Sequence, residues 1–228
     1  MNSLKEYENL INYLLSHDMK FSTKWNKKIS CSTLLLRHDI DFSLSHAYKL
    51  AKKELDLGVF STYFFMFSTN MYNLLSYKNR EIVKRIKSMG HKISLHFDPV
   101  AYSEIKSFKK EKAIFEKIFD QKVDIVSIHR PGKFLKKNNI KLFGISQTYQ
   151  DKYFKEMTYI SDSGGRDVMP LIKNYLEFKS NKGLHLLIHP IWWCKKSSSP
   201  TETLNDWKKE HIAYIENEIR VNCKTYLD

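Results

Sequence analysis

Two aspartates stand two positions apart at the end of a short apolar run. The run covers residues 34–36, and Asp39 and Asp41 follow it after Arg37 and His38. Such a run predicts a buried strand, and α/β folds place their chemistry at the carboxyl ends of strands. Because residues two apart on an extended chain point the same way, we expect Asp39 and Asp41 to share one pocket and His38 to pack elsewhere. In a purely structural alternative, one carboxylate caps the following helix and the other is solvated.

Polar side chains also end the other predicted strands of the chain. They are His96 and Asp98, His129 and Arg130, Asp162, and His189. In a barrel all these strand ends meet at one mouth. Aspartate and neutral imidazole are common ligands of zinc and related ions. A bound ion acidifies water and polarises a carbonyl, a spare carboxylate can accept a proton, and a spare histidine can protonate a leaving group. The set therefore predicts metal-assisted hydrolysis, although each histidine alone is also typical of a core or cap position.

Short apolar runs alternate with amphipathic stretches along the whole sequence. The predicted strands are 33–37, 59–67, 91–96, 123–128, 144–148, 158–161 and 184–188, and the predicted helices are 4–15, 43–56, 72–89, 101–119 and 200–220. This alternation indicates a parallel sheet covered by helices. We expect an α/β fold, a distorted or incomplete β/α barrel of about seven parallel strands. Residues 1–228 would form one catalytic domain, with 1–30 as an N-terminal helical extension and 199–228 as a C-terminal helix.

Composition restricts the class of protein. The chain has 228 residues, 42% of them hydrophobic, and a net charge of +13. That charge suits anionic groups on a partner, but no nucleic-acid motif accompanies it, so no specific nucleic-acid partner is expected. The seven glycines form no Gly-rich turn between a strand and a helix, which argues against a dinucleotide or P-loop site.

The cysteine spacing and the lack of a recognisable targeting signal predict a cytoplasmic protein. Three widely spaced cysteines with no Cys-x-x-Cys pair suit a reducing compartment. The N-terminal residues lack the apolar core of a signal peptide. The longest nearly apolar run, residues 57–67, is shorter than the roughly 20 residues that span a bilayer. We therefore expect no membrane span.

Five segments resemble a known family when they are taken together. They are RHDID at 37–41, GVFSTYFF at 58–65, GHKISLH at 90–96, SIHRP at 127–131 and LLIH at 186–189. In this order they resemble the polysaccharide-deacetylase superfamily of carbohydrate esterases, which shares the nodulation-protein-B homology domain. The resemblance spans roughly residues 33–190. It implies a distorted β/α barrel, a divalent metal ion that is most often zinc, and removal of acetyl groups from sugars.

The resemblance assigns roles to the first acids and histidine. It implies that Asp39 is the general base and that Asp41 and His96 are metal ligands. The family has its two acids adjacent, whereas Ile40 separates them here, so the two acid roles could be exchanged. The family also has a second histidine four residues after the first. Val100 stands at that position in this chain, which breaks the family's ligand triad.

The remaining roles follow from the later segments. We expect His129 to replace the missing ligand, because it ends a neighbouring strand, with Asp98 as the alternative. The resemblance further implies that Arg130 orients the base carboxylate and that His189 acts as the acid on the leaving group. Residues expected to contact substrate are Asp162, Arg166 and Trp192.

The sequence thus predicts a metal-dependent hydrolase that removes an N-acyl group, such as acetyl, from a sugar. The expected substrate is a carbohydrate precursor of a surface glycan, nucleotide-linked or lipid-linked. Two alternatives stay open: another metal-dependent C–N hydrolase on the same fold, such as a deformylase or imidase, or a catalytically idle glycan-binding protein. The sequence makes no prediction of the oligomeric state.

Overall fold

A single parallel sheet forms the centre of the molecule. The computed structural model describes residues 3–101, 105–132, 139–178 and 181–226. Its strands are β1 (Lys20–Phe21), β2 (Thr33–Ile40), β3 (Thr62–Phe65), β4 (Lys92–Phe97), β5 (Ile125–Ile128), β6 (Ser146–Gln147), β7 (Thr158–Ser161) and β8 (Leu184–Ile188). The spatial order is β6-β5-β4-β3-β2-β8-β7, with β1 added beside the start of β2. Every pairing is parallel.

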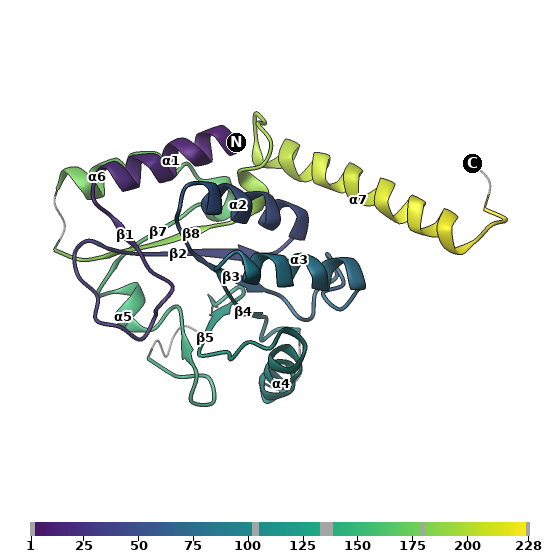
Figure 1. Cartoon of the computed structure of the whole chain (residues 1–228), viewed down its shortest axis with the longest axis horizontal. Helices are drawn as coiled ribbons and strands as arrows, with labels where there is room; N and C mark the ends of the chain where they lie inside the picture. Colours follow the sequence, from purple (N-terminus) through teal and green to yellow (C-terminus); the bar gives the residue numbers. More distant parts are fainter. Residues whose placement is uncertain (1–2, 102–104, 133–138, 179–180, 227–228) are drawn as a thin grey trace.

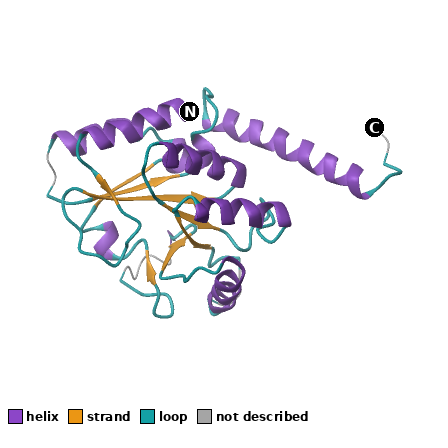
Figure 2. Ribbon diagram, viewed as in Figure 1, coloured by secondary structure: helices purple, strands orange, loops and turns teal. Residues whose placement is uncertain are grey.

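Helices follow most of the strands and cover the outer face of this sheet (Figure 1; Figure 2). The longer ones are α1 (Leu4–Ser16), α2 (Leu44–Asp56), α3 (Tyr77–Ser88), α4 (Ser107–Phe119), α6 (Met169–Glu177) and α7 (Pro200–Asn222), and the short ones are α5 (Asp151–Phe154), η2 (Ser163–Gly165) and η3 (Pro190–Trp192). None of the helices in the described part of the chain has both the length and the apolar character needed to cross a membrane.

The strands curl into a half-barrel, which confirms the predicted incomplete β/α barrel. Two apolar clusters lie between the sheet and the helices: one joins α1 and α6 to β2 and β8, and the other joins α2, α3 and α4 to β3 and β4. A third, smaller cluster fills the inner, concave face and contains Trp25, Phe64 and Tyr153. The two faces of the central strands β2, β3, β4, β5 and β8 are therefore both buried, as is typical of a parallel sheet.

Several predicted elements are shorter in the structure, for local reasons. The predicted strand 59–67 is reduced to β3, because the Val59 amide still donates to the carbonyl of Glu54 and completes the end of α2 through Gly58, whose φ is +69°. The predicted helix 72–89 begins only at Tyr77, since the Ser76 hydroxyl accepts from the Asn79 amide and caps it there. Part of the predicted helix 101–119, residues 102–104, lies outside the described residues.

The N-terminal segment belongs to the body of the fold. Tyr7, Leu10 and Ile11 of α1 have no exposed surface and lie in a main core cluster. β1 extends the sheet, with Lys20 opposite Thr33. Within the described residues 3–30, the predicted N-terminal extension therefore contributes a packed helix and a short strand to the fold. The predicted C-terminal helix is present, with Ser199 as its N-cap followed by a proline at the first helical position.

Candidate active site

Strand β2 sends alternate side chains to the two faces of the sheet. Leu34 packs under the helices, whereas Leu35 belongs to the cluster on the inner face. The alternation continues to the strand end, so Arg37 and Asp39 lie on the inner side with Leu35. Asp41 follows just after the strand and lines the same cavity as Asp39. The prediction that the two aspartates share one pocket is confirmed.

This cavity lies at the carboxyl end of the sheet and has a volume of about 250 Å³. The ends of β2, β4, β5 and β8 all contribute to its wall. Its polar lining consists of Asp39, Asp41, His96, His129, Arg130, Tyr149, Ser163 and His189, and its aromatic lining also includes Phe42 and Trp192. Parallel strands thus bring together residues that are far apart in the sequence, as expected at this end of an α/β sheet.

Three of the cavity residues are arranged so that they could hold a metal ion. Asp41, His96 and His129 each offer one ligand atom, and these atoms lie within 4.8 Å of one another. Asp41 Oδ1 is 3.2 Å from His96 Nε2, and the rings of His96 and His129 meet edge to face with centroids 5.1 Å apart. These are the three residues that the sequence predicted as ligands. Val100, at the position of the family's second histidine, is 74% exposed.

The surroundings of the three residues fit a bound cation. Asp41 Oδ1 is buried without a hydrogen-bond partner although His96 Nε2 lies close by. Burial alone would raise the pKa of Asp41, but the neighbouring His96, His189 and His129 outweigh it and lower the pKa to about 2. The carboxylate is therefore ionised at neutral pH, as a ligand must be. One carboxylate and two imidazoles, with room for water beside them, match the donor set of a catalytic divalent ion such as zinc.

Asp98 stands behind His129. Its Oδ2 atom lies 2.9 Å from His129 Nδ1, and its Oδ1 atom accepts from the Val100 amide at 2.9 Å. A carboxylate on Nδ1 fixes the ring and leaves Nε2 available, which is the usual support of a metal-binding histidine. The geometry thus favours His129 as the third ligand and gives Asp98 the supporting position.

Asp39 is held by Arg37 on its own strand and by Ser127 on β5, and Tyr149 in turn holds Arg37. Its Oδ2 atom lies 3.3 Å from Arg37 Nη2 and accepts from the Ser127 hydroxyl at 2.8 Å, while Oδ1 has no hydrogen-bond partner. Tyr149 accepts from Arg37 Nη2 at 2.9 Å and completes the setting. Burial tends to raise the pKa of Asp39, but the Arg37 guanidinium, with His96 and His189, lowers it below its ordinary value. Asp39 is therefore an oriented, ionised carboxylate with one free oxygen.

The arginine that contacts Asp39 is not the one that the sequence predicted. Arg37 is fully buried beside it, whereas Arg130 is exposed on the cavity wall, and no ion pair of Arg130 is found among the described residues. Arg130 adopts φ +46°, a left-handed conformation that turns the chain after β5. The assignment of Arg130 as the orienting residue is therefore corrected to Arg37.

His189 forms a second charged pair on the opposite side of the cavity. Its Nδ1 atom lies 2.6 Å from Asp162 Oδ1, and its backbone amide also donates to this carboxylate. Nε2 faces Asp41, at 3.9 Å from its Oδ2. Burial would lower the pKa of His189, but Asp162 outweighs this effect and the pKa rises to about 9. The imidazole is held with Nε2 toward the cavity, as proton donation requires.

The three residues predicted to contact substrate lie in different places relative to the cavity. Asp162 is only 1% exposed, and Trp193 Nε1 also donates to its Oδ2 at 2.8 Å, so it supports His189 from behind the cavity. Arg166 is exposed and is not among the residues that line the cavity. Trp192 does line it, next to His189. Of the three, Trp192 alone lines the cavity, although most of its side chain is buried in the core, and its contact with substrate stays a prediction.

The sequence reasoning missed three residues of the site: Arg37, Ser127 and Tyr149. For Arg37 the signal was present, because a guanidinium inside an apolar strand, two residues before an acid, shares the face of that acid. Ser127 likewise precedes His129 by two residues on β5. Tyr149 follows the two-residue strand β6 and carried no pattern that would have singled it out.

Comparison with known proteins finds matches among solved structures alone. No family model matches the sequence, and no curated protein matches it. Several solved structures do match the fold of this chain. A CE4 family pseudoenzyme from Bacillus anthracis is 16% identical at a TM-score of 0.47, over 81% of this chain and 60% of that one. The peptidoglycan deacetylase PdaC from Bacillus subtilis is 15% identical at a TM-score of 0.47, over 87% and 98% of the two chains.

A third structure is a family 4 acetyl xylan esterase from Clostridium thermocellum in complex with a cobalt ion. It is 12% identical at a TM-score of 0.42, over 79% of this chain and 84% of that one. The chain spans about three fifths of the length of the pseudoenzyme. At these identities and TM-scores the likeness carries no conclusion about this chain, whose chemistry is argued from its own residues.

Proposed function

We propose that the protein is a metal-dependent hydrolase that removes an N-acyl group from a sugar. The observation that carries this proposal is the meeting of three arrangements in one cavity. A possible metal site, an oriented carboxylate and a carboxylate-held imidazole lie within a few ångströms of Asp41. Together they provide for activation of water and protonation of a leaving nitrogen.

Each residue has a defined part in the proposed reaction. Asp41, His96 and His129 would hold the ion, which when bound acidifies a coordinated water and polarises the acyl carbonyl. Asp39, through its free Oδ1 atom, accepts the proton of the attacking water, while Arg37 and Ser127 keep the carboxylate in place. His189 donates a proton from Nε2 to the departing amine, because Asp162 binds Nδ1 and stabilises the imidazolium.

The substrate class is part of the proposal. Trp192 is 6% exposed, and the exposed part of its side chain on the cavity wall would contact a sugar bound there. The net charge of +13 suits a substrate that carries phosphate, such as a nucleotide-linked or lipid-linked precursor of a surface glycan. The cytoplasmic location expected from the sequence is a prediction that cell fractionation tests.

Metal content and acetate release test the proposal. The purified chain is stripped with a chelator, loaded with zinc and analysed for metal, and acetate release is measured on N-acetylglucosamine, its oligomers and its nucleotide-linked form. We expect about one equivalent of metal per chain. His96→Ala and His129→Ala should abolish both binding and activity. Asp39→Asn is the matched control: it should keep the metal and lose activity by a factor of about 10² to 10⁴.

The same measurements separate the alternatives. Release of formate, or opening of a cyclic imide, without acetate release would favour another C–N hydrolase. Glycan binding with no turnover of any acylated substrate would favour an idle binding protein. A chain that takes up no metal under any loading condition would contradict the proposed mechanism.

A further inference from the structure

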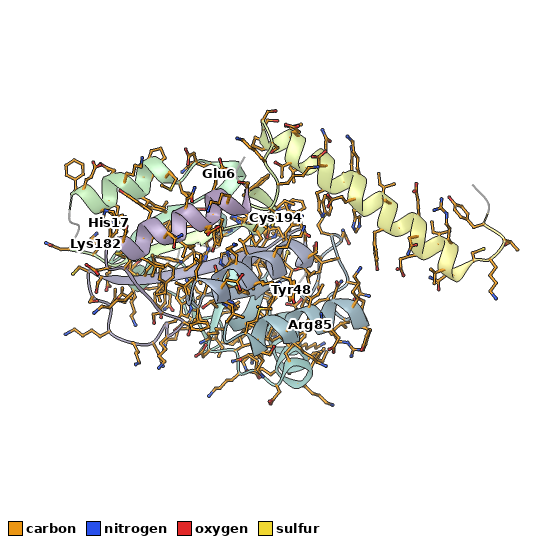
Figure 3. The ribbon with its side chains drawn as sticks, turned by 45° about the horizontal axis from the view of Figure 1, so that its top comes forward. Glu6, His17, Tyr48, Arg85, Lys182 and Cys194 are labelled. Atoms are coloured by element: carbon orange, nitrogen blue, oxygen red, sulfur yellow. The ribbon has the colours of Figure 1, made fainter. Side chains whose placement is uncertain are left out.

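The C-terminal helix α7 packs little against the rest of its own chain. It has 23 residues, of which only Thr203 is buried, and its C-terminal part extends away from the sheet (Figure 1). Trp207 meets the ring of Phe42, and Lys78 lies over the ring of Tyr214 across a hollow that α7 lines on one side. Figure 3 shows its side chains projecting outward along most of its length. Most of the stability of a helix in a protein comes from packing of one face against a neighbour. A helix this long with so little packed surface therefore indicates a partner.

The exposed part of α7 carries a stripe of isoleucines. Ile212, Ile215 and Ile219 are 48%, 44% and 38% exposed. Their spacing of three and four residues places them on one side of the helix, the pattern through which helices pair in coiled coils. Branched apolar residues in contiguous exposed positions mark an interaction site more often than a solvated face.

The charges of α7 indicate that the partner of the isoleucine stripe is a second copy of this chain. The chain has a net charge of +13, yet α7 contains five acidic and three basic residues. Two copies of a strongly basic chain repel each other, and α7 adds no net positive charge to this repulsion. The charges are also segregated along the helix, with Lys208 and Lys209 before the isoleucine stripe and Glu216 and Glu218 within its second half.

We propose that two copies of the protein associate through α7 in an antiparallel pair. With the two-fold axis between Ile212 and Ile215, each of these residues faces the other one in the second copy. In this register Lys208 lies beside Ile219, and Lys209 lies across from Glu216 of the second copy. A parallel pair would instead place two Lys208 side chains face to face, and like charges that meet are destabilising. The charge pattern therefore fixes the orientation.

The size of the stripe limits the strength of the pair. Three isoleucines and their flanking charges offer less than the roughly 800 Å² per partner of a standard stable interface. We therefore expect a reversible dimer with a dissociation constant on the order of 10 µM. Such a dimer forms at the concentrations of a sedimentation experiment and dissociates on dilution.

Sedimentation velocity of the full chain between about 1 and 100 µM tests the proposal. The wild type should shift from monomer to dimer, and Ile212→Glu should stay monomeric. Lys209→Glu should weaken association at least tenfold, because it creates a like-charge pair with Glu216.

The double variant Lys209→Glu, Glu216→Lys should restore association, since the charges of the pair are then exchanged. Glu210→Lys, on the side of α7 away from the stripe, is the control for Glu216→Lys and should dimerise like the wild type.

Two outcomes overturn the proposal. A wild-type chain that stays monomeric over the whole range excludes the dimer. A dimer that forms but is unchanged by Lys209→Glu, or not restored in the double variant, excludes the antiparallel register. Circular dichroism of each variant confirms that α7 stays folded.

Discussion

Asp39 is a buried carboxylate whose position depends on one buried cation. Arg37 is 0% exposed, and Asp39 is 2% exposed. Taking one partner from such a pair leaves an uncompensated charge in the interior, which is far more costly than loss of a surface pair. Arg37 therefore serves both the stability of the protein and the orientation of the proposed base.

Replacement of this arginine distinguishes it from Arg130. Arg37→Met should lower the free energy of unfolding by about 3–5 kcal/mol, because the Asp39 charge loses its partner. It should also reduce acetate release, while Arg130→Met should change stability by less than about 0.5 kcal/mol as an exposed substitution. Urea unfolding and the acetate assay measure both effects. A larger loss of stability in the Arg130 variant would return the orienting role to Arg130.

Two carboxylates behind the cavity support different histidines. Asp98 contacts His129, and Asp162 contacts His189. Since His129 belongs to the proposed metal site and His189 does not, the same chemical change at the two acids should have different consequences. This contrast tests the assignment of the two histidines within one experiment.

We expect Asp98→Asn to weaken metal binding by about 10- to 100-fold, as is typical when the support of a ligand is removed. Asp162→Asn should leave the metal affinity within about threefold of the wild type and lower kcat, because an amide cannot stabilise the imidazolium. Competition with a chelator gives the first quantity, and acetate release at saturating zinc gives the second. Loss of metal in the Asp162 variant instead would place His189 among the ligands.

At the scale of elements, one carboxylate on α2 joins three parts of the fold. Glu54 is fully buried on the helix side of the sheet, where it accepts from Ser61 Oγ at 2.6 Å and from the hydroxyls of Tyr63 and Tyr7. His38 Nε2 lies 2.7 Å from it. His38 is the residue that alternates with Asp39 on β2, so Glu54 anchors the strand that carries the proposed base from the opposite face.

Glu54→Gln should destabilise the protein by about 3 kcal/mol, because the amide presents a donor to groups that must themselves donate. Glu8→Gln is the control, since Glu8 pairs with Lys53 at the surface and its replacement should change the stability far less. Urea unfolding of both variants measures the difference. Equal stability of the two variants would show that the buried network does not anchor β2.

At the scale of the whole molecule, buried titratable groups make the fold sensitive to acid. Burial lowers the pKa of His46 to about 4 and that of His185 to about 3. These imidazoles are neutral in the folded protein, whereas the unfolded chain binds protons below about pH 6.5. Burial would raise the pKa of Glu54, but His38 outweighs it and lowers the pKa to about 2. Its stabilisation is present above about pH 4.5 and is lost as the pH falls toward 2.

All three groups therefore act in the same direction. The free energy of unfolding should fall as the pH drops below about 6.5, with about 3 kcal/mol of the loss due to His46 between pH 6.5 and 4. His46→Leu should flatten the curve over this interval, and the exposed His17→Leu should not. Urea unfolding as a function of pH, with a chelator present to exclude metal effects, measures the slope. An unchanged slope in the His46 variant would contradict the prediction.

The sequence alone determined much of the fold, and it predicted residues that the fold brings into one cavity. Apolar runs that end in polar residues located β2, β4, β5 and β8, because strands buried on both faces must be apolar until they leave the sheet. Helix ends followed from local chemistry, as at Ser199 and Pro200, which begin α7. The resemblance to a family predicted Asp41 and His96 as ligands, and His129 was predicted because it ends a neighbouring strand; the ligand set stays a prediction.

The tertiary structure decided which partner each of these residues has. Arg37 rather than Arg130 reaches Asp39, because a buried strand holds a side chain on a fixed face while the turn after β5 leaves Arg130 in solvent. Asp162 supports His189 instead of contacting substrate, since β7 and β8 lie side by side in the sheet. Arg37 and Asp39 are neighbours in the sequence, but Asp162 and His189 are 27 residues apart, and Ser127 and Asp39 are 88 residues apart. Strand alternation gives a side chain its face, but only the packed sheet determines which distant side chain it meets there.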